Sequence, residues 1–208
     1  MKYNLKAAGL ILTLGIIIIS GACKEKEKVH FEEGAYKVGQ KGPAGGWVFY
    51  DKGNYDEGWR YLEAAPVDQA VVAISEGWFS RDTGGAQWGC YNKTIPGAQG
   101  RTLGRGKYNT QAIIKESKNT AAWLCTVYRG GGKNDWFLPS INELKYMRQN
   151  LHKQGIGNFQ NKGDYLSSSE MNPRYAFSYS FDIKLYPNAR RTTSEKTYGN
   201  HVRAVRAF

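Results

Sequence analysis

The N-terminal 23 residues place the strongest constraint on this chain. Two lysines, Lys2 and Lys6, precede an uncharged and almost wholly apolar run from residue 7 to residue 19. Three small residues and then Cys23 follow the apolar run. A basic start, an apolar middle and a small-residue end are typical of a secretory signal peptide. The run is shorter than the roughly 20 residues that a helix needs to cross a bilayer, so we expect the leader to be removed.

Cys23 directly after small residues resembles the lipobox of bacterial lipoproteins, with Ser20 where the common pattern has Leu. The resemblance implies that residues 1–22 are cleaved off and that fatty acyl chains such as palmitate are attached to Cys23. Such chains contribute about 0.8 kcal/mol per buried methylene, so several of them anchor a protein stably. An uncleaved anchor and an ordinary signal peptide with an incidental cysteine are the alternatives. Lys24, where an aspartate would favour the inner membrane, favours the outer membrane.

Two further segments follow the predicted cleavage site. Residues 23–35 comprise the lipidated cysteine and a charged tether, because residues 24–28 alternate Lys and Glu and can bury nothing. Residues 36–208 are then enough for one domain with a sizeable core.

Positive charge is concentrated in two parts of the chain. The formal net charge is +11, and the leader holds two of the 29 basic residues. Residues 92–118 and residues 171–208 each carry a strong basic excess. Clustered positive charge attracts polyanions. Outside the cytoplasm these are sulfated or acidic polysaccharides and anionic lipid headgroups, so we expect no nucleic-acid partner. A solvated basic surface without a partner is the alternative.

Cys90 and Cys125 remain once Cys23 carries lipid. An even number of cysteines in an exported protein indicates a disulfide bond. Two free, buried thiols are the alternative.

Apolar spacing predicts strands at both ends of the domain and helices between them. Residues 47–50 and 59–65 form a hairpin around a polar loop at 51–58, and residues 67–106 form a long surface excursion. One helix, capped by Asn109 or Thr110, runs through Ile113, and a second is capped by Asn119 or Thr120.

The best-defined helix start is Ser140 with Glu143, which fit a capping box. After that helix, aromatic residues at every second position from Tyr175 to Phe181 and the final residues 201–208 predict strands. The order of elements favours an α+β fold.

Several motifs in this order resemble the Lcl (Legionella collagen-like) C-terminal domain family, over about residues 36–208. The resemblance implies a C-type-lectin-like fold with paired terminal strands, two or three helices and long loops. It also implies a non-enzymatic, adhesin-type role in carbohydrate binding, since the best understood member binds sulfated polysaccharides through basic surface. The chain has no Gly-X-Y stalk, so trimerisation through a stalk is not implied, and Leu166 stands where the family usually has Trp. The motifs are 42–50 (GPAGGWVFY), 58–65 (GWRYLEAA), 88–90 (WGC), 135–140 (DWFLPS) with Glu143-Leu144, 165–170 (YLSSSE) and 202–206 (VRAVR).

The sequence holds no motif of a catalytic, metal or cofactor site, so we expect a binding protein rather than an enzyme. The candidate ligand-binding residues lie in a glycine-rich loop at 100–107 and a turn region at 187–199, whereas Arg203 and Arg206 are expected to be paired within the sheet. Arginine suits this role because its guanidinium offers two donors at once to sulfate or carboxylate. We expect a lipid-anchored protein that binds anionic glycan or extracellular matrix; the alternative is a structural envelope lipoprotein with protein partners. The candidates are Arg101, Arg105, Lys107, Arg190 and Arg191.

Overall fold

The computed structural model describes residues 35–69, 85–188 and 190–208. All of them lie in the second of the two units into which the chain divides, Gly34–Phe208. The predicted signal peptide, Cys23 and the tether up to residue 34 lie outside the described residues, as do residues 70–84 of the predicted surface excursion. None of the helices within the described ranges has the length and apolar character to span a membrane.

The predicted hairpin forms the first sheet. Strands β1 (Trp47–Asp56) and β2 (Trp59–Ala64) are antiparallel, and β8 (Val205–Ala207) pairs with β2 on its other side. Strand β1 runs through most of the predicted loop, because the turn needs only Glu57 (φ 47°) and Gly58 (φ 77°). Positive φ at both turn residues matches the twist of the flanking strands. The hairpin at the start of the domain and the last strand of the chain therefore share one sheet.

The second sheet is buried on both faces along its first two strands, whereas its last strand is mostly exposed. It consists of β4 (Asp164–Glu170), β5 (Tyr175–Ser180) and β6 (Arg190–Glu195), all antiparallel, while β3 (Ala86–Gln87) and β7 (Gly199–Asn200) form a separate small pair. The predicted alternation along β5 is confirmed, but the small residues between the aromatic ones are buried as well. The turn predicted at 187–199 is wrong in part, since Arg190 and Arg191 lie in β6.

Three α-helices lie within the described residues, α1 (Arg105–Glu116), α2 (Ala121–Val127) and α3 (Ile141–Asn150), with short 3₁₀ turns at Gly130–Gly132 and His152–Gln154. The capping box is confirmed: Ser140 and Glu143 each bond the other's backbone N–H. Thr120 caps α2 by accepting from the N–H of Trp123.

The predicted start of α1 is wrong, because Asn109 and Thr110 lie buried inside the helix. Their side chains bind backbone atoms of Gly100 and Leu138 instead of capping a terminus. As a result, Arg105 and Lys107 belong to the first turn of α1 rather than to a loop.

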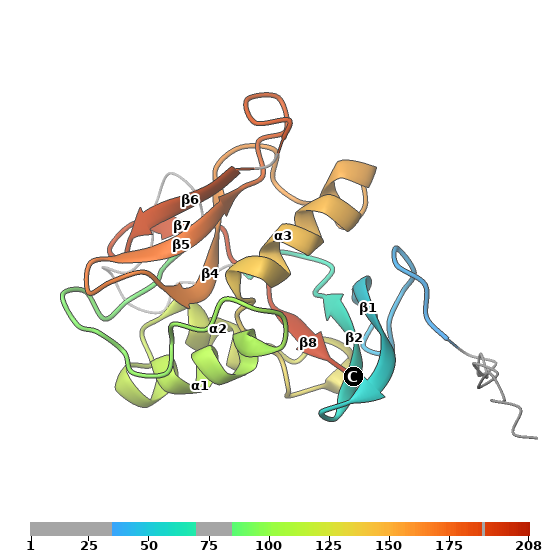
Figure 1. The fold of residues 1–208 in the computed structure, drawn as a ribbon, viewed down its shortest axis with the longest axis horizontal. Coiled ribbons are helices and arrows are strands. Elements are labelled where there is room, and N and C mark those ends of the chain that lie inside the picture. The colour runs from blue at the N-terminus through green and yellow to red at the C-terminus, as the bar shows by residue number, and fades with distance from the viewer. Residues whose placement is uncertain (1–34, 70–84, 189) are drawn as a thin grey trace, which may run out of the picture. The chain divides into compact units, whose positions relative to one another are not determined.

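Helices α1 and α2 lie below the second sheet in Figure 1, and α3 lies to its right. Two apolar cores meet at this sheet. Leu166 and Ala176 belong to a cluster with residues of α1 and α2, whereas Phe177 and Tyr179 belong to a cluster with residues of α3 and the first sheet. Each face of β4 and β5 thus packs against its own helices, which explains why even the serines of β5 are buried. The described residues form a mixed α+β domain, as the element order predicts.

Glu63 of β2 is the centre of a buried ion network. Its carboxylate accepts from the backbone N–H groups of Ala44 and Gly46 (3.2 and 3.1 Å) and from Nη1 of Arg206 (2.7 Å). Arg206 also makes two 2.8 Å bonds to Asp135, which hold the pKa of Asp135 below its usual range. A Cβ at Gly46 would lie 2.5 Å from the carbonyl oxygen of Ala64, so this approach requires glycine. The network ties β1, β2, β8 and the segment before α3 together.

Arg203 forms a second buried junction. Its guanidinium binds Asp68 (2.6 Å) and the backbone carbonyls of Ala65, Gly157 and Asn158. The prediction that both arginines are paired within the sheet is confirmed for Arg206, which binds Glu63 on the neighbouring strand, whereas Arg203 is paired outside the strands.

Lys196 forms a third buried junction. Its Nζ lies 2.6 Å from Glu170 and 2.7 Å from the carbonyl of Lys93, above the ring of Trp88. Both members of this ion pair are almost fully buried.

The expected disulfide between Cys90 and Cys125 is not formed, and both residues are free thiols. Cys125 is fully buried on α2, and Cys90 packs half-buried against the same apolar cluster. Burial raises the pKa of each thiol, so neither is readily ionised. The two cysteines serve as apolar core residues, which is the alternative that the sequence left open.

Replacing Arg206 by Ala is expected to lower the free energy of unfolding by about 3–5 kcal/mol, because Glu63 and Asp135 lose their shared cation. Urea unfolding monitored by circular dichroism measures this change. The matched control is Arg60→Ala, which removes a more exposed pair with Asp51 and should cost about 1 kcal/mol or less. Equal losses for the two variants would contradict the central role of the network.

Candidate functional site

The five candidate cations remain on the surface. All five are exposed, and none of them forms a salt bridge with any residue that the structure describes. By contrast, three other cations of the basic segment at 171–208, Lys196, Arg203 and Arg206, are buried and paired. Part of the basic excess is therefore internal, and the unpaired surface charge falls on fewer residues than the sequence suggests.

Arg101 and Arg191 meet over one aromatic ring. Their guanidinium carbons lie 4.4 and 5.1 Å from the centroid of Phe177. Arg191 points to the same face of the sheet as Phe177, because it pairs with Tyr179 two residues along β5. The two distances keep the guanidiniums within about 10 Å of each other, roughly the Debye length at 0.1 M salt. Two chain segments that are distant in sequence thus form one paired cationic spot.

The loop that carries Arg101 is held by hydrogen bonds to β4 and α3. The carbonyl of Gly100 accepts from Ser169 Oγ (2.7 Å), and the carbonyl of Arg101 accepts from the N–H of Asn142 (3.2 Å). These bonds fix the backbone under Arg101 while its side chain stays exposed. The Arg101 side of the cationic spot on Phe177 is therefore held in place by contacts with two neighbouring elements.

Arg105 and Lys107 line a different feature, a pocket of about 440 Å³. Its walls come from the β1–β2 turn, the loop before α1 and the first turn of α1. Arg105 also lies 5.0 Å over the ring of Tyr108, which is 55% exposed. Sequence reasoning missed Glu57 and Tyr108, because a turn glutamate and a lone tyrosine carry no motif.

Arg190 lies apart from both groups. It points to the opposite face of β6 from Arg191 and contacts the ring of Tyr186 at 5.0 Å. The structure therefore separates the five candidates into a pair at Phe177, a pair at the pocket and a single residue.

Glu143 supports the pocket from below. Besides capping α3, its carboxylate accepts from the N–H groups of Gly104 (2.8 Å) and Gly106 (3.4 Å), and Gly104 lines the pocket. A Cβ on Gly106 would lie 2.3 Å from Glu143 Oε2, so the close approach requires glycine. Burial raises the pKa of Glu143 to about 7, although the N–H donors oppose the shift. The same carboxylate fixes the start of α3 and the start of α1.

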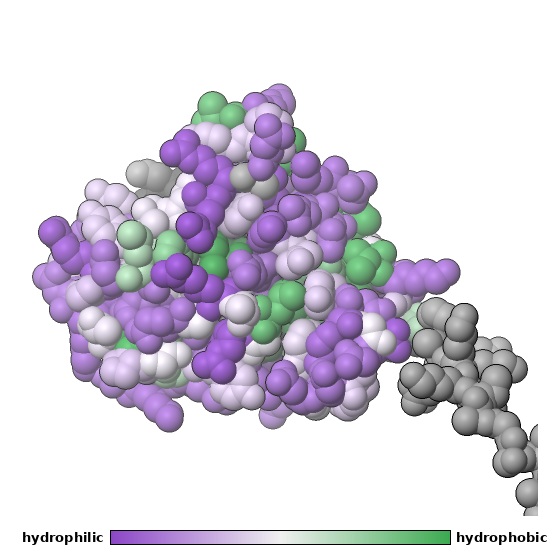
Figure 2. All heavy atoms as spheres, viewed as in Figure 1, coloured by the Kyte–Doolittle hydropathy of each residue, from purple (hydrophilic) through white to green (hydrophobic). Residues whose placement is uncertain are grey.

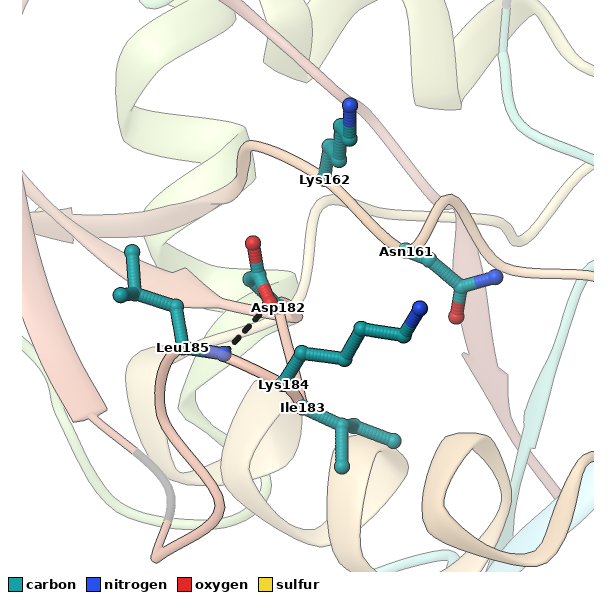
Figure 3. Close-up of a pocket in the computed structure, with 6 residues that line it drawn as sticks. All are labelled: Asn161, Lys162, Asp182, Ile183, Lys184 and Leu185. Atoms are coloured by element: carbon teal, nitrogen blue, oxygen red, sulfur yellow. Dashed lines mark hydrogen bonds between the residues drawn. The ribbon is translucent and has the colours of Figure 1, made fainter.

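A second pocket, of about 660 Å³, lies between residues 161–162 and the turn at 182–185 (Figure 3). The Asp182 carboxylate accepts from the N–H of Leu185 (2.8 Å) and stabilises that turn. In Figure 3 Lys184 extends toward Asn161, whereas Lys162 extends away from it. The two lysines do not converge, so this larger pocket is the weaker candidate for an anion.

No group of three His, Cys, Asp or Glu side chains within the described ranges could hold a metal ion. His152 bonds the backbone carbonyl of Phe181, and His201 bonds that of Lys162.

The face drawn in Figure 2 is mostly hydrophilic, with hydrophobic residues in small separate patches.

Comparison with known proteins adds no assignment. No family model matches the sequence. No curated protein matches it either.

Glu143 makes a specific contribution to the pH dependence of stability. Because its folded-state pKa lies above the ordinary value near 4.5, the folded state binds this proton more tightly. That stabilisation is complete below about pH 4.5 and is lost as the pH rises through 7. The difference in unfolding free energy between the unaltered chain and Glu143→Gln should therefore fall by on the order of 1–3 kcal/mol between pH 4.5 and 8.

Urea titrations of both proteins across this range measure the difference. His152, whose pKa burial lowers, contributes with the opposite sign and is present in both proteins, so its effect cancels. Glu116→Gln, which removes a surface carboxylate that pairs with Lys93, is the control for the loss of one acidic side chain. A Glu143→Gln difference that is constant with pH would contradict the prediction.

Proposed function

We propose that the chain is an exported lipoprotein whose domain binds anionic glycan at the cell envelope, in a non-enzymatic role. The observation that carries the proposal is the convergence of Arg101 and Arg191 on Phe177. Two exposed guanidiniums that have no carboxylate partner among the described residues attract a polyanion. Their contacts with the ring of Phe177 hold both arginine side chains in place. A repeating anionic chain such as a sulfated polysaccharide suits this spot, because arginine binds sulfate through two donors.

The domain is proposed to have a C-type-lectin-like fold. Pairing of β8 with the N-terminal hairpin, three helices within the described residues and the long segment between β2 and α1 support this proposal. They are also what the resemblance to the Lcl C-terminal domain family implies. Fold alone does not specify a ligand, so the glycan proposal depends on the arginine pair.

Anchoring through Cys23 to the outer membrane is part of the same proposal. Its support is the sequence of the leader, with its basic start, apolar run and small residues before the cysteine. A lipid anchor would place the domain where extracellular polysaccharide is available.

Replacing both Arg101 and Arg191 by Ala is expected to lower the salt concentration at which the full chain, in neutral detergent, leaves a heparin column. The reason is that the variant removes the paired cations while Phe177 stays in the core. The matched control is Lys115→Ala with Lys118→Ala, which removes the same charge from exposed positions at the end of α1.

Equal elution of the two double variants would show that retention reflects net charge alone and would contradict the site. In that event the structural alternative gains support if crosslinking in intact cells captures one stable protein neighbour.

Mass spectrometry of the chain isolated from membranes of the producing cell is expected to find an N-terminus at Cys23 that carries acyl groups. Cys23→Ser should remain uncleaved, since cleavage in lipoproteins follows attachment of lipid to the cysteine. An intact Met1 in the unaltered chain, or a sulfur without modification at Cys23, would contradict the anchor.

A further inference from the structure

The pocket at the start of α1 differs in charge from the arginine pair at Phe177. Arg105 and Lys107 line it together with Glu57, whose carboxylate has no salt-bridge partner among the described residues. The lining side chains therefore sum to a single positive charge, while the pair at Phe177 carries two positive charges and no carboxylate. Lys107 also lies near Asp135 and lowers its pKa, but Asp135 is already bound by Arg206.

The pocket has the size and the groups that a sugar ring requires. A volume of about 440 Å³ falls in the range of small-molecule sites. The exposed ring of Tyr108 offers an apolar face to the C–H side of a pyranose, and the carboxylate of Glu57 can accept from hydroxyl groups. Arg105 and Lys107 can donate to a carboxylate.

The walls of the pocket are fixed before any ligand binds. Glu57 and Gly58 form the tight turn of the hairpin, and the Arg105 N–H donates to the carbonyl of Thr102 (3.2 Å). Glu143 holds Gly104 and Gly106 from below. Preorganised walls reduce the entropy cost of binding.

We propose that this pocket is a separate subsite that takes one carboxylate-bearing sugar residue, a uronic acid, in preference to a sulfated one. Arg105 and Lys107 bind the carboxylate, Tyr108 packs against the ring, and Glu57 accepts from hydroxyls. Glu57 is the specificity-determining residue, since its charge repels the denser negative charge of sulfate groups and an unpaired carboxylate facing an anion is unfavourable. The proposal deepens the glycan-binding function above and rests on it for its biological setting, but its test is independent.

The test is isothermal titration calorimetry of the full chain in neutral detergent with three tetrasaccharides. These are tetragalacturonate, a heparin-derived tetrasaccharide, which carries sulfate groups in addition to its uronic carboxylates, and uncharged maltotetraose. Tetragalacturonate should bind measurably and more weakly at high salt, whereas maltotetraose should not bind. Arg105→Gln with Lys107→Gln should weaken tetragalacturonate binding at least tenfold, and the control Lys115→Gln with Lys118→Gln should leave it unchanged.

Glu57→Gln distinguishes the proposed preference from simple charge attraction. It should strengthen binding of the heparin tetrasaccharide several-fold more than binding of tetragalacturonate, because the repelling carboxylate is gone. Equal strengthening of both ligands, or tetragalacturonate binding that is insensitive to Arg105 and Lys107, would overturn the proposal. All of these positions are exposed, so the variants keep the core intact.

The experiments test the arginine pair and the pocket independently. Arg101→Ala with Arg191→Ala should reduce retention on heparin and leave tetragalacturonate affinity within twofold. If heparin retention does not depend on that pair, the function proposed above fails while the subsite stands. If tetragalacturonate does not bind and heparin retention does depend on the pair, the subsite fails alone.

Discussion

The buried contact between Glu63 and Arg206 is the interaction on which the rest of the domain depends. Two charges removed from water are costly unless each is fully hydrogen-bonded, and here Glu63 accepts from Ala44, Gly46 and Arg206. Arg206 completes its own bonding through Asp135. The network joins the hairpin β1–β2 to the last strand and to the segment that leads into α3, so β2 and β8 cannot separate without exposing both charges.

Local signals predicted the elements that depend on neighbouring residues. The capping box at Ser140 and Glu143 and the cap at Thr120 use contacts within three residues, and sequence alone reveals them. The start of α1 was missed because its N-terminus has no side-chain cap, and Glu143, nearly forty residues away, supplies the acceptor. The hairpin was underestimated because its turn needs only two residues.

Only part of the candidate site could be predicted from the sequence. The uneven distribution of basic residues along the chain identified the exposed arginines. Which of them lie together depends on contacts between segments that are distant in sequence. Lys196 and Arg191 look alike in sequence, yet Lys196 binds Glu170 in the core and Arg191 lies over Phe177. Arg148 shows the limit of such reasoning: it is fully buried on α3, with one bond to the carbonyl of Tyr186 and no partner for Nε or Nη1 among the described residues. No sequence pattern separates these cations.

The division of the basic residues into paired and unpaired sets connects stability with function. A cation that satisfies a buried carboxylate cannot bind an external anion without destabilising the fold, so the proposed anion binding must use the remaining cations. Those that remain differ in their neighbours: Arg101 and Arg191 share an aromatic ring, and Arg105 shares a pocket with Glu57. The cations of the two places are alike and their neighbours differ. The proposed selectivity between sulfate and carboxylate therefore depends on Glu57, which lines the pocket and has no counterpart at the arginine pair.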